Sequence, residues 1–242
     1  MPGEVQTGLP VGNGTGMSPR HDTVLLDVDG TLVDTTYHHA LAWARAFRSL
    51  DVDVPLWEVH RAIGMGGDKL VAAVAGDEVE ERHGDDLRQR WLDEYEPLRA
   101  EVMPLPGAAD LVRLLKDRGF RVALASSGKP QHTEQAVELL GVGDLLDAVT
   151  TSEETSESKP EPSIPETALK KAGGTSAIMV GDSTFDIEAA ARMGAPCVVV
   201  RTGGFGVDEL EGAGAVLVAD DPRALLTADW DALAVAEAPK PS

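Results

Sequence analysis

Residues 24–34 decide the fold and read Val24-Leu25-Leu26-Asp27-Val28-Asp29-Gly30-Thr31-Leu32-Val33-Asp34. A short apolar run that ends at a glycine turn is typical of a buried strand followed by a loop. Asp27 and Asp29 stand where this strand ends. Ligands of an open parallel sheet bind outside the carboxyl ends of its strands, so these two carboxylates are the first candidates for a functional site.

Beyond residue 100, short apolar runs alternate with helical patterns. We predict strands at about 121–125, 148–151, 177–180 and 197–201, separated by helices at 109–118, from 130 onward, at 164–172 and at 186–193. Alternating buried strands and helices indicate a parallel sheet that is covered on both faces. The fold class is therefore α/β, with a Rossmann-like, doubly wound parallel sheet.

Between the first strand and this alternating region lies a purely helical stretch, residues 36–100. Ala40, Trp43, Ala44 and Phe47 follow the helical period, and so does a second stripe of Leu87, Trp91, Tyr95 and Leu98. We predict a core domain from residues 21–35 and 101–235, with residues 36–100 inserted as a helical domain. Residues 1–20, rich in Gly, Pro, Thr and Ser, are predicted to be a flexible tail.

Composition excludes several classes of function. The 242 residues carry 21 Lys and Arg against 41 Asp and Glu, a net charge of −20, which disfavours nucleic acid and anionic membranes as partners. The single cysteine, Cys197, allows neither an internal disulfide nor a cysteine-based zinc site. No apolar run approaches the roughly 20 residues that span a bilayer, and no secretory signal is evident, so we expect a cytoplasmic protein. Its oligomeric state stays open between a monomer and a homodimer.

Further polar residues follow the other predicted strands. They are Ser126 and Ser127 after the second strand, Lys159 in a later loop, Asp182 after the fourth strand, and Asp186 one helical turn on. Converging carboxylates repel one another unless a cation joins them, and hard oxygen ligands select Mg²⁺. Asp27 and Asp182 are the natural pair of ligands.

The remaining groups suit a phosphate ester. Ser126 and the start of the following helix offer donors to a phosphate, and Lys159 offers an ammonium. Asp27 could attack phosphorus to give an aspartyl-phosphate. Asp29 could act as acid and then base, a role for which we expect a raised pKa.

These residues resemble the motifs of the haloacid-dehalogenase-like (HAD) superfamily. The octapeptide 27–34 is similar to the first motif, Ser126 to the second, Lys159-Pro160 to the third, and Gly181-Asp182-Ser183-Thr184-Phe185-Asp186 to the fourth. The resemblance covers about residues 22–220 and implies a Mg²⁺-dependent enzyme with an aspartyl-phosphate intermediate.

The resemblance also implies a role for each matching residue. Asp27 would be nucleophile and metal ligand, Asp29 acid/base and a ligand through its carbonyl, Asp182 a ligand, and Asp186 an orienting partner. Phosphate binding would involve Gly30, Ser126, Ser127 and Lys159.

The helical insertion resembles the family's C1 cap, which closes over the site and reads the leaving group. Residues 61–67, Arg61-Ala62-Ile63-Gly64-Met65-Gly66-Gly67, are the candidate substrate-facing loop, in which Arg61 could clamp an anion. We interpret His38 and His39, at the start of the cap, as packing or exposed residues rather than catalytic ones.

Three functions fit the sequence. The favoured one is a phosphatase for a small phosphate monoester, a sugar phosphate or phosphoglycolate. The alternatives are a phosphomutase of the β-phosphoglucomutase type and a binding protein on the same scaffold without turnover. Ile63, Gly66 and Gly67 stand where the mutase has polar or basic residues, which favours hydrolysis.

Overall fold

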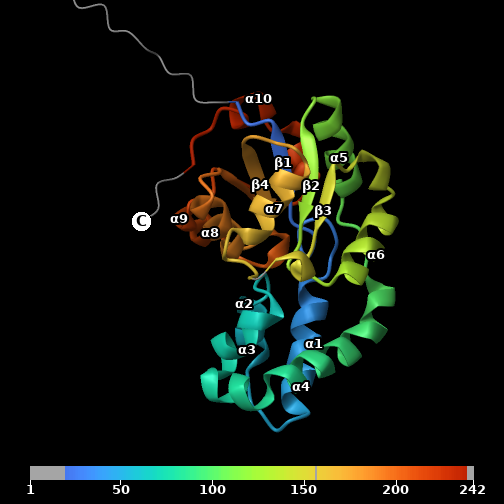
Figure 1. The fold of residues 1–242 in the computed structure, drawn as a ribbon, viewed down its shortest axis with the longest axis vertical. Helices are drawn as coiled ribbons and strands as arrows, with labels where there is room; N and C mark the ends of the chain where they lie inside the picture. Colours follow the sequence, from blue (N-terminus) through green and yellow to red (C-terminus); the bar gives the residue numbers. More distant parts are fainter. Residues whose placement is uncertain (1–19, 156, 239–242) are drawn as a thin grey trace, which may run out of the picture.

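The computed structural model describes residues 20–155 and 157–238, and its centre is a six-stranded parallel sheet (Figure 1). The strands lie in the order β3-β2-β1-β4-β5-β6. Their bounds are β1 Thr23–Leu26, β2 Arg121–Ala125, β3 Ala148–Thr150, β4 Ala177–Gly181, β5 Cys197–Val200 and β6 Leu217–Ala219. Apart from Arg20, the tail predicted over residues 1–20 lies outside the described residues.

Successive side chains of each strand enter two separate apolar layers, as the period of two in a strand requires. Leu26 and Val180 join the layer with α5 (Ala108–Asp117), α6 (Pro130–Leu140) and α10 (Trp230–Leu233). Leu25 and Met179 join the layer with α7 (Ser163–Lys171), α8 (Thr184–Arg192) and α9 (Val207–Ala213). The sheet is thus covered by helices on both faces.

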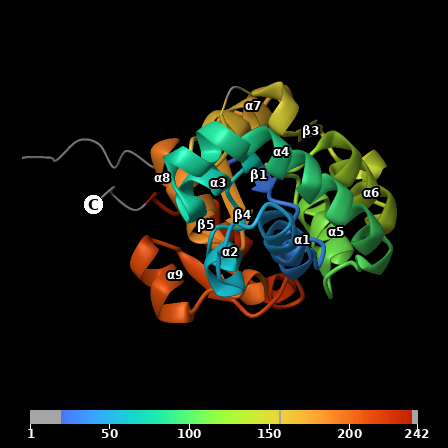
Figure 2. The same cartoon turned by 90° about the horizontal axis from the view of Figure 1, so that it is seen from below.

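The chain between β1 and β2 forms the cap. It contains α1 (Thr36–Arg48), α2 (Leu56–Arg61), α3 (Gly67–Ala75), α4 (Asp77–Tyr95) and the 3₁₀ helix η1 (Glu96–Glu101). Its own apolar core includes Trp43, Phe47, Val59, Leu70 and Leu87. The four α-helices lie together at one end of the sheet, below the strands in Figure 1, and Figure 2 shows α1, α3 and α4 across that end.

The topology creates a crevice at the centre of the sheet. From β1 the chain runs through the cap to β2 and β3 on one side, and then returns to β4 on the other side of β1. Such a reversal opens a crevice beyond the carboxyl ends of the two central strands. The cap lies over that end.

The predicted fold class, an α/β doubly wound parallel sheet with a helical insertion, is confirmed. Five of the strands and the helices between them were predicted within a few residues, whereas β6 and the helices that flank it were not. Cys197 lies buried in β5. Over the described residues, no helix combines the length and the apolar character needed to span a membrane.

Candidate active site

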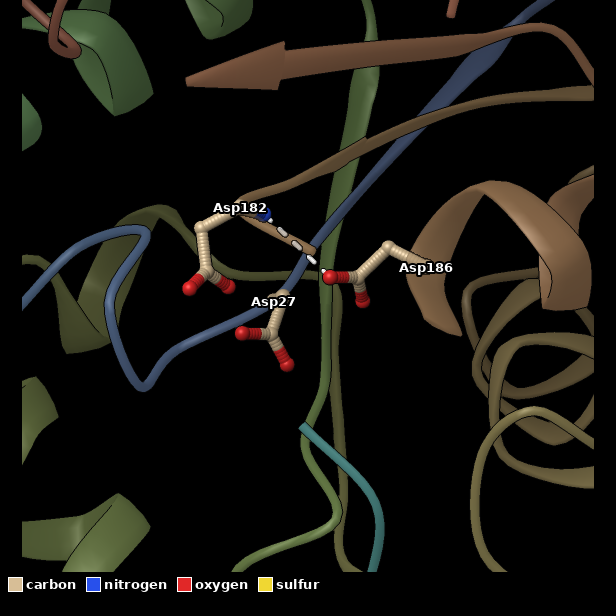
Figure 3. A group of neighbouring side chains, drawn as sticks. All are labelled: Asp27, Asp182 and Asp186. Atoms are coloured by element: carbon tan, nitrogen blue, oxygen red, sulfur yellow. Dashed lines mark hydrogen bonds between the residues drawn. The ribbon is translucent and has the colours of Figure 1, made fainter. Parts of the chain in front are cut away.

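Three buried carboxylates meet at the carboxyl ends of β1 and β4 (Figure 3). The two strands pair with Leu26 opposite Val180, and the Asp27 N–H donates to Val180 O at 2.9 Å. Asp182 directly follows β4, and Asp186 lies in the first turn of α8. One carboxylate oxygen from each of Asp27, Asp182 and Asp186 lies within 4.8 Å of the others. The strand register therefore brings together residues that are about 150 positions apart.

Asp186 is fixed by a capping box at the start of α8. Its Oδ2 accepts hydrogen bonds from Ser183 Oγ at 2.6 Å, Ser183 N at 3.1 Å and Asp182 N at 3.2 Å. In return, the Asp186 N–H donates to Ser183 Oγ. Because this box satisfies donors of the first turn, the same carboxylate both begins the helix and holds the backbone of Asp182 in place.

Lys159 supplies the positive charge of the cluster. Its side chain is 1 % exposed, and its Nζ donates to Asp27 and lies 2.8 Å from Asp186 Oδ1. Burial alone would lower the pKa of this ammonium, but the charges of Asp186 and Asp27 outweigh burial and raise it. Lys159 is therefore held in its charged form.

The cluster carries more negative charge than Lys159 can balance. Burial raises the pKa of Asp27 to about 7 in spite of Lys159, and burial together with Asp186 and Asp27 raises that of Asp182 well above its usual value. Three carboxylates face one ammonium, an excess of two negative charges when all are ionised. A divalent cation with hard oxygen ligands fits this set.

The backbone at two glycines packs closely against the Asp182 carboxylate. A Cβ on Gly30 would lie 2.8 Å from Asp182 Cγ and nearer still to its Oδ2, and a Cβ on Gly203 would overlap the same carboxylate. Thr31 Oγ1 lies 3.4 Å from Asp27 Oδ2 and 3.3 Å from Asp182 Oδ1, so the two carboxylates face a common point. Asp27 and Asp182 are the pair that could hold Mg²⁺.

Asp29 faces the cap rather than the acidic cluster. Its Oδ1 accepts hydrogen bonds from Thr35 Oγ1 at 2.7 Å and from His39 Nε2 at 3.1 Å. Burial opposes ionisation, but the charge of His39 and these two hydrogen bonds prevail and lower the pKa of Asp29 to about 2. The raised pKa expected from the sequence is wrong for this conformation, because these partners act more strongly than the neighbouring carboxylates.

His39 belongs to the site, although the sequence favoured a packing or exposed role. It is buried in α1, its ring stacks on Tyr95 at a centroid distance of 4.2 Å, and it lines the same cavity as Asp29. Thr35 and His39 are four residues apart around the start of a helix, so both point the same way. That spacing, directly after the first motif, is the signal that could have identified them.

The serines after β2 have different surroundings. Ser126 is fully buried, and its Oγ accepts the Gly128 N–H at 2.9 Å. Ser127 lines the cavity, and its Oγ is buried without a hydrogen-bond partner among the described residues. Because α6 begins at Pro130, Ser127 stands beside a helix N-terminus, where a phosphate is favoured.

Two further predicted residues lie in other surroundings. Arg61 does not line the cavity: its guanidinium pairs with Glu209 of α9 and lies 4.1 Å over the ring of Phe205. The Gly30 N–H donates to Val33 O at 2.9 Å, and the residue has a φ of 77°. Without a side chain, Gly30 leaves room for the Asp182 carboxylate. Arg61 connects the cap to the core.

A cavity of about 490 Å³ lies between the cap and the core and reaches Asp27 and Asp29. The cap loop contributes Ile63, Gly64, Met65, Gly66 and Gly67 to its wall. Of the residues predicted to bind phosphate, Ser127 lines the cavity, whereas Gly30, Ser126, Lys159 and Arg61 do not. The cap loop beyond Ala62 also lines the cavity. A substrate in it would contact both the cap and the core.

A doubly wound sheet with this acidic cluster, roofed by a helical insertion, defines a capped α/β hydrolase. The family model for haloacid dehalogenase-like hydrolases matches residues 21–194, and the chain belongs to that family. Its identification as an enzyme from the sequence is thereby confirmed.

Several relatives of this chain are named phosphatases. The chain is 31% identical to a phosphoglycolate phosphatase of Rhodospirillum rubrum, over 86% of this chain and 89% of that protein. It is 27% identical to a phosphoglycolate phosphatase of Pseudomonas putida, over 87% and 80%. Among solved structures, a hydrolase from Pseudomonas syringae superimposes with a TM-score of 0.79 at 29% identity, over 84% of this chain and 95% of that one.

Proposed function

We propose that the protein is a Mg²⁺-dependent phosphatase that hydrolyses a small phosphate monoester through an aspartyl-phosphate on Asp27. One observation carries the proposal. The Asp27 carboxylate accepts a hydrogen bond from the Lys159 ammonium, lies close to the Asp182 carboxylate and lines the cavity. A nucleophile beside an ammonium, and beside a second carboxylate that could share a divalent cation with it, is suited to attack on the phosphorus of an anionic ester.

In the first step, a carboxylate oxygen of Asp27 forms a bond to phosphorus, and the bond from phosphorus to the ester oxygen breaks. Mg²⁺, held by Asp27 and Asp182, would neutralise charge on the phosphoryl oxygens. Lys159 and the donors around Ser127 orient the group for in-line attack. The departing oxygen takes a proton from Asp29.

In the second step, water attacks phosphorus, Asp29 takes its proton, and the bond to Asp27 breaks to release phosphate. The observed contacts with Thr35 and His39 hold Asp29 as a carboxylate, which is the form this second step needs. Donation in the first step needs the protonated form, so Asp29 must first leave these two partners.

Relatives support hydrolysis of a phosphate ester. Two of them are phosphoglycolate phosphatases that align over most of this chain. Sugar phosphates and phosphoglycolate are the substrates to be tested first, and residues 36–100 would act as the cap that reads them.

Phosphate release in the presence of Mg²⁺ tests the proposal. We expect Asp27→Asn to abolish turnover and a chelator to do the same to the unchanged protein. Asp34→Asn is the matched control, because Asp34 is exposed in the same motif, outside the cluster. Equal activity of Asp27→Asn and Asp34→Asn would overturn the proposed nucleophile. Isomerised β-glucose 1-phosphate without release of phosphate would identify a mutase instead.

A further inference from the structure

The cavity extends well beyond the point where phosphorus would be attacked. Its volume of about 490 Å³ falls within the roughly 300–1,000 Å³ that is usual for small-molecule binding sites. Glycolate, a two-carbon group, would leave most of this space empty. The part away from Asp27 is therefore available to a larger leaving group.

Apolar residues of the cap form one wall of this outer part. They are Trp43, Met65, Leu70, Trp91 and Leu92. Polar side chains complete the lining, among them the hydroxyl groups of Ser152 and Thr155. A hydroxyl group can both donate and accept a hydrogen bond. An apolar wall beside such groups suits a hydroxylated ring.

The charges along the cavity disfavour an anionic leaving group. Besides Asp27 and Asp29, the lining carboxylates are Asp68, Asp85 and Glu157, and the lining cations are Arg88 and Lys129. Both cations already have acidic partners. Arg88 pairs with Glu80 and Asp85 at 2.9 Å, and Lys129 Nζ lies 3.6 Å from Glu153. A second carboxylate or phosphate on the substrate would thus meet an acidic wall.

Glu157 differs from the other two lining carboxylates. Asp68 accepts a hydrogen bond from Ser158 Oγ at 2.5 Å, and Asp85 pairs with Arg88. The carboxylate of Glu157 has no hydrogen bond or ion pair within residues 20–155 and 157–238, and the residue is exposed and lines the cavity. It is the carboxylate that is available to a positive group on a ligand.

We infer that the substrate is a monophosphate ester whose leaving group is a hydroxylated ring without an anionic substituent, and that Glu157 favours an amino substituent on it. The inference rests on the proposed phosphatase function for the position of the phosphate. It differs from that proposal in excluding phosphoglycolate and bisphosphates as preferred substrates.

Three matched esters test the inference, namely glucose 1-phosphate, glucosamine 1-phosphate and glucuronic acid 1-phosphate, each as both anomers, with phosphoglycolate beside them. We expect kcat/KM to be highest for the glucosamine ester, and that of the glucuronic acid ester to be at least about ten-fold below the glucose ester. Preference for the glucuronic acid ester or for phosphoglycolate would overturn the inference and leave the phosphatase proposal intact.

Variants of the wall sharpen the test. In Glu157→Lys, the kcat/KM for the glucuronic acid ester divided by that for the glucosamine ester should rise by about ten-fold or more. Glu166→Lys, an equal charge change on the exposed side of α7 and outside the cavity, should leave the ratio unchanged. Leu92→Trp should lower kcat/KM for the ring esters and not for phosphoglycolate. An unchanged ratio in Glu157→Lys would remove Glu157 from the inference.

Direct binding separates this inference from the phosphatase proposal. If the unchanged protein releases phosphate from none of the esters, the proposed function fails. Calorimetry of the three sugar esters and phosphoglycolate with the Asp27→Asn protein and Mg²⁺ then decides the leaving-group preference. Tighter binding of the glucosamine ester than of the glucuronic acid ester supports the inference, and the reverse order refutes it.

Discussion

Substitution of Gly30 by alanine tests how closely the first motif packs against Asp182. The residue has a φ of 77°, so any side chain there costs about 1–2 kcal/mol for the left-handed conformation alone. The new Cβ would also lie 2.8 Å from Asp182 Cγ, and relieving this overlap costs roughly 1–3 kcal/mol more. We expect Gly30→Ala to lower the free energy of unfolding by about 2–5 kcal/mol.

The overlap should also affect metal binding. The new methyl group would overlap Asp182 Oδ2 as well as Thr36 Oγ1, so we expect the Asp182 carboxylate to shift from its place near Asp27. The Mg²⁺ concentration for half-maximal phosphatase activity should therefore rise by about 10–100-fold, the range seen when metal ligands lose their orientation. Urea unfolding measures the first effect, and a Mg²⁺ titration of phosphate release measures the second.

Gly119→Ala is the matched control. Gly119 has a φ of 84°, nearly that of Gly30, but no atom lies within 4 Å of its Cβ position. This variant should show only the conformational cost of about 1–2 kcal/mol and an unchanged Mg²⁺ requirement. If the two variants lose equal stability and need the same Mg²⁺ concentration, the close approach of Gly30 to Asp182 affects neither stability nor metal binding, and the reasoning is refuted.

Three other predictions follow from single features of the structure. Arg61→Ala and Glu209→Gln should each change kcat/KM a few-fold, because both weaken the contact between cap and core. A double-mutant cycle of the free energy of unfolding should give a coupling of about 0.5–1 kcal/mol, and strictly additive effects would show that the contact contributes nothing. Burial and the charge of His39 lower the pKa of His132 to about 4, so the unfolded chain binds more protons and the free energy of unfolding falls as the pH drops from about 6.5 to 4. In His132→Leu, urea unfolding should show a fall over this pH range that is smaller by roughly 2 kcal/mol. An equal fall in the variant and the unchanged protein would contradict this. Because the pKa of Asp27 is about 7, the metal-free folded chain holds a proton that the unfolded chain releases, and the stability of the metal-free protein falls as the pH rises from about 4 to 7. The increase in Tm on adding Mg²⁺ should therefore grow from pH 5 to pH 8 and vanish with a chelator. A pH-independent increase in Tm would refute this prediction.

The sequence predicts the sheet well because its central strands are apolar throughout. β1, β4 and β5 are buried on both faces and read as continuous apolar runs. β6 has only three residues, and all of them are half-buried. So short a segment shows no pattern of apolar residues that would distinguish a strand from a loop. A short edge strand is defined by pairing with its neighbour, here β5, and that pairing is not visible in its own residues.

The acidic cluster could be predicted for a topological reason. Asp27 and Asp182 each follow a central parallel strand, and the ends of such strands meet at one edge. The partners of Asp29 and Arg61 could not be predicted in the same way. Thr35 and His39 reach Asp29 only because of how α1 enters the cap, and Glu209 reaches Arg61 across the boundary between cap and core. Contacts of this kind depend on how one unit docks against the other.

The net charge of −20 sets the order in which ligands can bind productively. Lys159 is already paired with Asp27 and Asp186, so in the metal-free protein it gives the phosphate little attraction. An incoming phosphate dianion would therefore meet a site with little positive charge unless a divalent cation were bound there. Once the cation neutralises Asp27 and Asp182, Lys159 and the N-terminus of α6 can act on the phosphate. Because such coupling is reciprocal, a bound phosphate must strengthen the binding of the metal by the same factor. An acidic protein can thus hydrolyse an anionic ester, provided that metal and substrate bind as one coupled pair.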